Sequence, residues 1–67
     1  MQWEEGYRIS VRTEDGAAVI SANREGLLSL SRHLAELAEG RSGDHSHLDR
    51  FNALEEDSAE LIIEKTE

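Results

Sequence analysis

The chain has 67 residues, no cysteine and a formal net charge of −8, so one small domain without disulfides is expected over residues 1–67. Its acidity disfavours binding to nucleic-acid phosphates or to anionic membranes. No apolar run approaches the roughly 20 residues that cross a bilayer, and the N-terminus lacks a basic region followed by an apolar one. We therefore expect a cytoplasmic protein.

Two strands joined by a tight turn are predicted at the start of the chain. From Trp3 to Arg12 apolar and polar residues alternate, which is the period-two pattern of a half-buried strand. Asp15 and Gly16 suit the positive φ angles of a tight hairpin turn. The nearly continuous apolar run Ala17–Ala22 predicts a second strand, in the interior of a sheet.

One helix is predicted between Asn23 and Gly40. Asn23 is a good N-cap, and Gly40 is a natural residue for the helix to end on. His33 is expected to be solvated, because it lies off the apolar stripe of this helix. Five apolar residues recur at the three-and-four spacing that makes one stripe facing a core: Leu27, Leu30, Leu34, Leu37 and Ala38.

Two further strands are predicted after the helix, from His45 to Phe51 and from Ala59 to Thr66. The residues between them return the chain through an acidic turn. In the last strand Ile62 falls on an otherwise charged face, which indicates either a lone exposed residue or part of a contact surface. The order of elements predicts an α+β fold. We expect a two-layer sandwich in which one helix covers one face of a single antiparallel four-stranded sheet.

A His-x-His-x-Asp pattern gives the third predicted strand its most distinctive chemistry. Because side chains alternate along a strand, His45, His47 and Asp49 project from the same face. Three interpretations remain open: ligands for a divalent metal such as zinc or nickel, a proton-linked binding patch, and a polar strand face on which Asp49 bonds to nearby backbone. No other cofactor is expected.

Motifs of enzymatic chemistry are absent from the sequence. It has no cysteine nucleophile, no glycine-rich phosphate loop and no Gly-x-Ser-x-Gly turn. Carboxylates near a histidine can support acid–base catalysis, but 15 acidic residues in 67 make such pairs unavoidable. We therefore predict that the protein is not an enzyme.

Three blocks between Asn23 and Lys65 resemble, in order, the immunity protein 32 family of bacterial polymorphic toxin systems. The blocks are Asn23-Arg24-Glu25-Gly26-Leu27-Leu28-Ser29-Leu30, then His45-Ser46-His47-Leu48-Asp49, then Leu54-Glu55-Glu56-x-Ser58-x-Glu60-Leu61-Ile62-Ile63-Glu64-Lys65. The resemblance implies a cytoplasmic antidote that binds a cognate toxin and blocks it.

The acidic composition is consistent with that role, because acidic side chains can match the basic groove of a nuclease toxin. Two other classes stay open: a small metal-binding protein that uses the His-x-His-x-Asp face, and a structural or homo-oligomeric module. We expect a monomer or a weak homodimer. The residues expected to contact a protein partner are His45, His47, Asp49, Glu55, Glu56 and Ile62.

Overall fold

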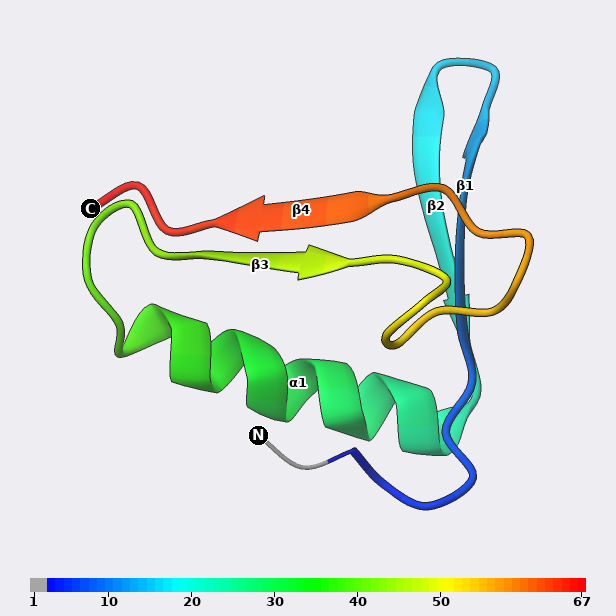
Figure 1. Cartoon of the computed structure of the whole chain (residues 1–67), viewed down its shortest axis with the longest axis horizontal. Helices are drawn as coiled ribbons and strands as arrows, with labels where there is room; N and C mark the ends of the chain where they lie inside the picture. Colours follow the sequence, from blue (N-terminus) through cyan, green and yellow to red (C-terminus); the bar gives the residue numbers. More distant parts are fainter. Residues whose placement is uncertain (1–2) are drawn as a thin grey trace.

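The computed structural model describes residues 3–67. The elements in this part of the chain are β1 (Ile9–Glu14), β2 (Ala17–Ala22), α1 (Arg24–Ala38), β3 (His45–Leu48) and β4 (Leu61–Glu64). The ribbon formed by β3 and β4 runs alongside α1, whereas the hairpin formed by β1 and β2 stands crosswise to both (Figure 1). The α+β class and the order of elements are therefore as predicted.

The four strands do not form the predicted single sheet. Within residues 3–67, β1 pairs with β2 and β3 pairs with β4 in two separate antiparallel sheets. The other edge of β1 is occupied by the connection between β3 and β4. Glu55 donates its N–H to the Ile9 carbonyl (2.8 Å). Val11 accepts from the Ala59 N–H (2.8 Å) and donates its own N–H to the Ser58 hydroxyl (3.1 Å). Because this irregular segment takes the edge groups, no further strand can add there.

The first hairpin begins later than predicted but turns where predicted. Before it, the Tyr7 N–H donates to the Glu4 carbonyl (3.1 Å), so the chain makes a turn and β1 starts only at Ile9. Asp15 and Gly16 both have positive φ (50° and 83°), which confirms the two-residue turn. β2 is not an interior strand, because most of its residues are exposed.

The N-terminus of α1 is fixed by its cap. The side-chain oxygen of Asn23 accepts from the N–H of Gly26 (2.8 Å) and from the N–H of Arg8 (3.0 Å). The side-chain amide of Asn23 also donates to the Gly6 carbonyl (3.0 Å). The predicted N-cap is confirmed, and it ties the helix to the segment that leads into β1.

The inward face of α1 differs from the predicted leucine stripe. Leu30 is buried as predicted, but the residues beside it in the interior are Gly26 and Ser29. His33, predicted to be solvated, is half-buried, and its ring nitrogen bonds to the Ser46 hydroxyl. Three members of the predicted stripe are exposed instead: Leu27, Leu34 and Ala38.

The C-terminus of α1 is held by a residue from the far end of the chain. The Lys65 ammonium group donates to the carbonyls of Ala38 (2.6 Å) and Gly40 (2.7 Å). A cation at this position is favourable because the end of a helix carries partial negative charge and unpaired carbonyls. Lys65 follows β4, so this contact joins α1 to the second sheet.

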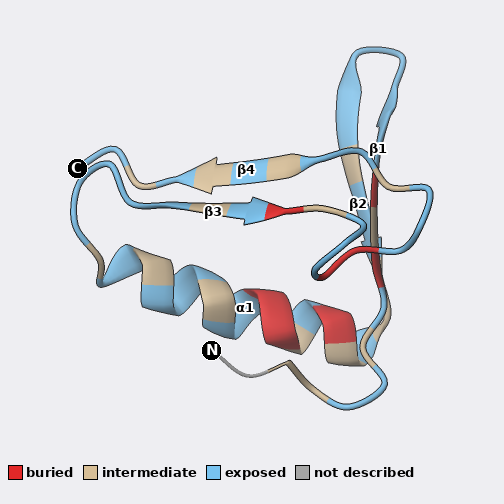
Figure 2. Cartoon of the chain, viewed as in Figure 1, coloured by how far each residue is buried: buried red, intermediate tan, exposed pale blue. Residues whose placement is uncertain are grey.

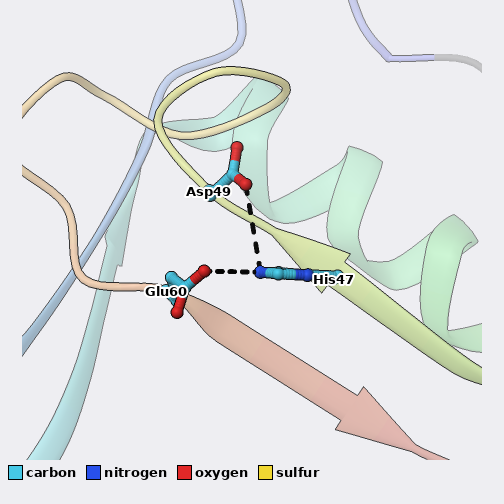
Figure 3. A group of neighbouring side chains, drawn as sticks. All are labelled: His47, Asp49 and Glu60. Atoms are coloured by element: carbon cyan, nitrogen blue, oxygen red, sulfur yellow. Dashed lines mark hydrogen bonds and ion pairs between the residues drawn. The ribbon is translucent and has the colours of Figure 1, made fainter.

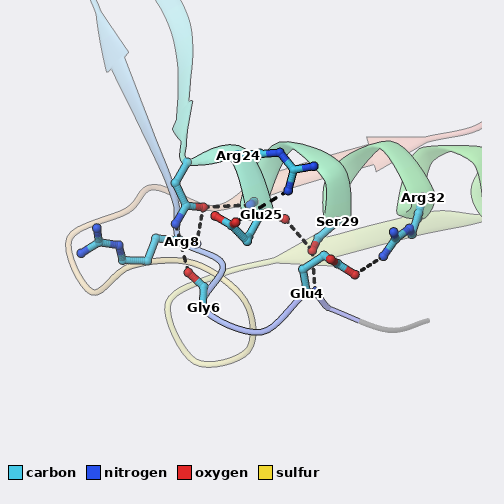
Figure 4. Close-up of polar contacts among 9 residues, drawn as sticks. Glu4, Gly6, Arg8, Arg24, Glu25, Ser29 and Arg32 are labelled. Atoms are coloured by element: carbon cyan, nitrogen blue, oxygen red, sulfur yellow. Dashed lines mark hydrogen bonds and ion pairs between the residues drawn. The ribbon is translucent and has the colours of Figure 1, made fainter.

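The segment before β1 packs against α1. The Trp3 ring stacks between Tyr7 (4.9 Å between centroids) and His33 (5.7 Å). The Glu4 N–H donates to the Ser29 hydroxyl (2.7 Å), and the Glu4 carboxylate pairs with Arg32 (Figure 4). These contacts dock the start of the described chain onto the helix.

The core lies where the first hairpin, α1 and the connection between β3 and β4 meet (Figure 2). Trp3, Tyr7, Ala22 and Leu61 pack around it and are partly buried. The buried hydrophobic residues are Ile9, Val11, Leu30, Leu48, Ala53 and Leu54.

Candidate functional site

The outer face of the second sheet is a row of exposed polar side chains interrupted by one isoleucine. His45 lies opposite Glu64, and His47 lies opposite Ile62. All four are exposed, and Ile62 keeps 61% of its surface accessible. We call these four residues the outer face. Leu48 and Leu61, on the opposite side of the ribbon, face the core.

A histidine and two carboxylates converge at the end of this face (Figure 3). The His47 Nε2 atom lies 2.8 Å from a carboxylate oxygen of Glu60 and 3.9 Å from one of Asp49. All three candidate ligand atoms lie within 4.8 Å of one another. We call His47, Asp49 and Glu60 the triad. It can offer one nitrogen and two oxygens to a cation.

Asp49 is oriented by the turn that ends β3. One oxygen of its carboxylate accepts from the Phe51 N–H (2.9 Å), while the other points toward His47. Asn52 closes the same turn: its side chain accepts from the Asp49 N–H and donates to the His47 carbonyl, both at 2.9 Å. β3 therefore ends at Leu48 and not at Phe51, and Asp49 does bond to nearby backbone, as one of the three interpretations held.

The structure brings together only part of the predicted ligand set. His47 and Asp49 meet in the triad, whereas His45 lies two residues along β3, opposite Glu64 and outside this group. Glu60 takes its place in the group. The sequence alone does not single out Glu60, because it reaches His47 only through the pairing of β3 with β4, which local periodicity does not determine.

The other predicted partner-binding residues, Glu55 and Glu56, lie in the connection between β3 and β4. Both are exposed, and with Asp57 they make a run of three carboxylates. We call these three residues the acidic loop. They line a shallow surface hollow beside Ser10 and Arg12 of β1. The acidic loop therefore adjoins the first hairpin and is separate from the outer face.

Phe51 is an exposed aromatic residue that the sequence interpretation did not assign to a contact surface. It retains 83% of its accessible surface, at the tip of the turn after β3. The Arg50 guanidinium lies 4.9 Å from the centre of its ring, a cation–π arrangement. The sequence would indicate this exposed aromatic residue only if Asp49 and Arg50 were first recognised as part of a turn, because a residue at the tip of a turn is exposed.

A second surface hollow, of about 500 Å³, lies between the C-terminal half of α1 and β3. His33 and Leu37 line it from the helix, and His45 and Ser46 line it from the strand. His33 and Ser46, which face each other across it, are hydrogen-bonded. The hollow is open to solvent, and His45 is the residue of the outer face that lines it.

Comparison with known proteins gives one decisive match. The family model described as Immunity protein 32 matches residues 18–66. The chain belongs to the immunity protein 32 family. No curated protein and no solved structure matches it. In the described residues of this family member, no helix is long and apolar enough to cross a membrane.

The family match spans most of the features described above. Residues 18–66 begin in β2 and include α1, both strands of the second sheet and the triad. They also include Lys65, which caps α1. Family membership thus confirms the resemblance drawn from the sequence and indicates an immunity-type function.

Proposed function

We propose that this protein is the cytoplasmic antidote of a bacterial toxin: it binds the toxin and blocks it without catalysing a reaction. Membership of the immunity protein 32 family carries the proposal. The net charge of −8 supports it, because a strongly acidic surface attracts a basic partner over distance and speeds their encounter.

Two surfaces suit such a partner in different ways. The acidic loop supplies exposed carboxylates for a basic groove. The outer face offers Ile62 as an apolar anchor, flanked by His45, His47 and Glu64. Interfaces gain most of their affinity from a few buried apolar or aromatic groups, and charges at the rim mainly set the association rate. We therefore assign steering to the acidic loop and anchoring to the outer face.

The decisive experiment uses a candidate toxin, sought first among the genes adjacent to the gene for this protein. We expect co-expression of this protein to restore growth of cells that carry the toxin, and the purified proteins to form a complex by titration calorimetry. Binding should weaken as ionic strength rises from about 0.01 M to 0.15 M, because the Debye length falls from about 30 to about 8 Å. A protein that neither rescues growth nor binds the toxin would overturn the proposal.

Matched variants separate the two surfaces. Glu55→Gln with Glu56→Gln should slow association, whereas Glu5→Gln with Glu39→Gln, the same charge change elsewhere on exposed residues, should alter it less. Ile62→Ala should speed dissociation, while Leu27→Ala, at an exposed helix position, should leave it unchanged. If the affinity did not change with salt but was lost in Ile62→Ala, we would assign the whole contact to the outer face.

A second candidate function, binding of zinc or nickel, is favoured by the triad. The 2.8 and 3.9 Å separations between its ligand atoms bracket the roughly 3.4 Å expected between ligands around a tetrahedral ion with bonds of about 2.1 Å. One nitrogen and two oxygens suit these borderline ions. Three ligands would leave a coordination position open to water or to a partner side chain.

A zinc titration followed by NMR tests this second candidate. The expected result is a stoichiometric shift of the His47 ring resonances, absent in His47→Gln and Glu60→Gln. His45→Gln is the matched control, since His45 shares the strand and the face but lies outside the triad. Equal shifts of all the histidines, or none, would contradict a site at the triad.

A further inference from the structure

The free edge of β2 carries an inference that goes beyond the proposed function. The hairpin turn makes Glu14 and Ala17 the first paired residues, so Ala17, Val19 and Ser21 hydrogen-bond to β1. The N–H and C=O groups of Ala18, Ile20 and Ala22 point away from β1. Within residues 3–67, no backbone hydrogen bond outside the hairpin involves these three residues.

This edge lacks the features that normally prevent strand addition. Exposed edge strands are usually short, charged, bulged or interrupted by proline. β2 is six residues long, has the sequence Ala-Ala-Val-Ile-Ser-Ala, and contains neither a charge nor a proline. Ile20 keeps 45% of its surface accessible. β4 has only four residues and ends on Glu64, so it is the better protected of the two strands.

We propose that β2 pairs with β2 of a second copy of this chain, in antiparallel orientation about a two-fold axis at Ile20. In that register Ala18 faces Ala22 of the other copy, and Ile20 faces its own counterpart. All three residues with outward backbone groups then form hydrogen-bonded pairs. The outward N–H and C=O groups of each β2 strand are therefore satisfied by the other copy. The two hairpins become one continuous four-stranded sheet, and the contact closes on itself.

The uncharged sequence of β2 suits a second copy as the occupant. The paired strands are uncharged, so they bring no like charges into contact although each chain carries −8. The paired segment runs from Ala18 to Ala22, and in each copy it is flanked by Asp15 in the turn at one end and by Arg24 at the start of α1 at the other. The antiparallel arrangement therefore places the exposed Arg24 of one copy at the same end of the contact as the exposed, oppositely charged Asp15 of the other. The two-fold axis repeats this attraction at both ends.

The dimer should be weak and dependent on concentration, because one pair of strands buries less than the roughly 800 Å² per partner of a stable interface. Sedimentation equilibrium should show a mass that rises from monomer to dimer as the protein is concentrated. Ile20→Lys should hold the mass at the monomer value, because a charge in the edge blocks pairing. Ile62→Lys, the same change on the exposed outer face, should still dimerise. Circular dichroism confirms that each variant is folded.

Two further measurements locate the contact. At high concentration, hydrogen exchange should slow at the amides of Ala18, Ile20 and Ala22 but not at Ile62 on β4. Arg24→Glu should weaken the dimer more than Arg41→Glu, which reverses a charge away from β2. A monomer at every concentration, or a dimer unaffected by Ile20→Lys, would overturn the proposal. Protection of the β2 amides only after the toxin is added would assign the edge to the toxin and would equally overturn it.

Discussion

Replacing Leu30 with alanine is expected to lower the free energy of unfolding by about 3 kcal/mol, within the range for buried leucines. Leu30 is 7% exposed and belongs to the core cluster with Ile9 and Val11. The loss combines the apolar surface returned to water with the cavity left behind. A domain of 67 residues has only about 3 to 10 kcal/mol of stability. Urea denaturation followed by circular dichroism should show a largely unfolded or strongly weakened protein.

Leu34→Ala supplies the control, because it makes the same change one turn further along α1. Leu34 is 44% exposed, so the expected loss is about 1 kcal/mol or less. The leucine stripe predicted from the sequence would make the two variants equivalent. Equal losses would therefore show that Leu34 belongs to the core as much as Leu30 does, and would contradict its exposed position.

Gly26→Ala is expected to destabilise the protein by about 3 kcal/mol, the upper part of the usual range for overpacking. A Cβ atom at Gly26 would lie 2.5 Å from the Arg8 carbonyl oxygen and 2.9 Å from the Ile9 side chain. The nearest obstacle is backbone and cannot rotate away. The hairpin and the helix would have to move apart, which would also stretch the bond from the Arg8 N–H to the Asn23 side chain.

The sign of this effect makes it diagnostic. In an exposed helical position, alanine is more favourable than glycine by about 1 kcal/mol. The reverse change, Ala35→Gly, at an exposed position of the same helix, should show that ordinary preference as a loss of about 1 kcal/mol. Thermal unfolding of both variants is the measurement. A neutral or stabilising Gly26→Ala would contradict the close approach of α1 to β1.

The local elements were predictable because their causes are local. Asp15 and Gly16 adopt the positive φ angles that their residue types favour, and Asn23 caps the helix that follows it. Neither prediction required knowledge of which distant segment packs nearby. The turn at Asp49 is also local, with partners two and three positions away, but the alternation led to a strand predicted as far as Phe51, and bonding of Asp49 to backbone was one of three open interpretations.

The arrangement of the strands was not predictable from such signals. Alternation identifies a strand but not its partner. The edge of β1 is taken by Glu55 and Ser58, which have no strand pattern, and by Ala59, which was predicted to begin the last strand although β4 runs only from Leu61 to Glu64. The same limit explains Glu60. Its place in the triad depends on the pairing of β3 with β4, whereas the alternation within β3 pointed to His45.

The orientation of α1 was misjudged because small residues made the inward face inconspicuous. Gly26 and Ser29 are buried, since the helix approaches the first hairpin too closely for larger side chains there. The periodicity argument counts only apolar residues, and it therefore placed Leu27 and Leu34 on the inward face. The glycine and the serine in the first two turns of the helix were the residues that could have indicated close packing. An argument from hydrophobicity alone does not take them into account.

The stacking of Trp3 between Tyr7 and His33 gives the protein a spectroscopic reporter. Trp3 is the sole tryptophan, so tryptophan fluorescence reports on the docking of the N-terminal segment onto α1. Far-ultraviolet circular dichroism reports on the helix as a whole. Coincident melting curves from the two signals would mark one cooperative unit. An earlier change in emission would mark a segment that detaches first, as a separate unit of low local stability. The same emission, followed during a titration with a partner, distinguishes contacts that disturb this segment from those that leave it in place.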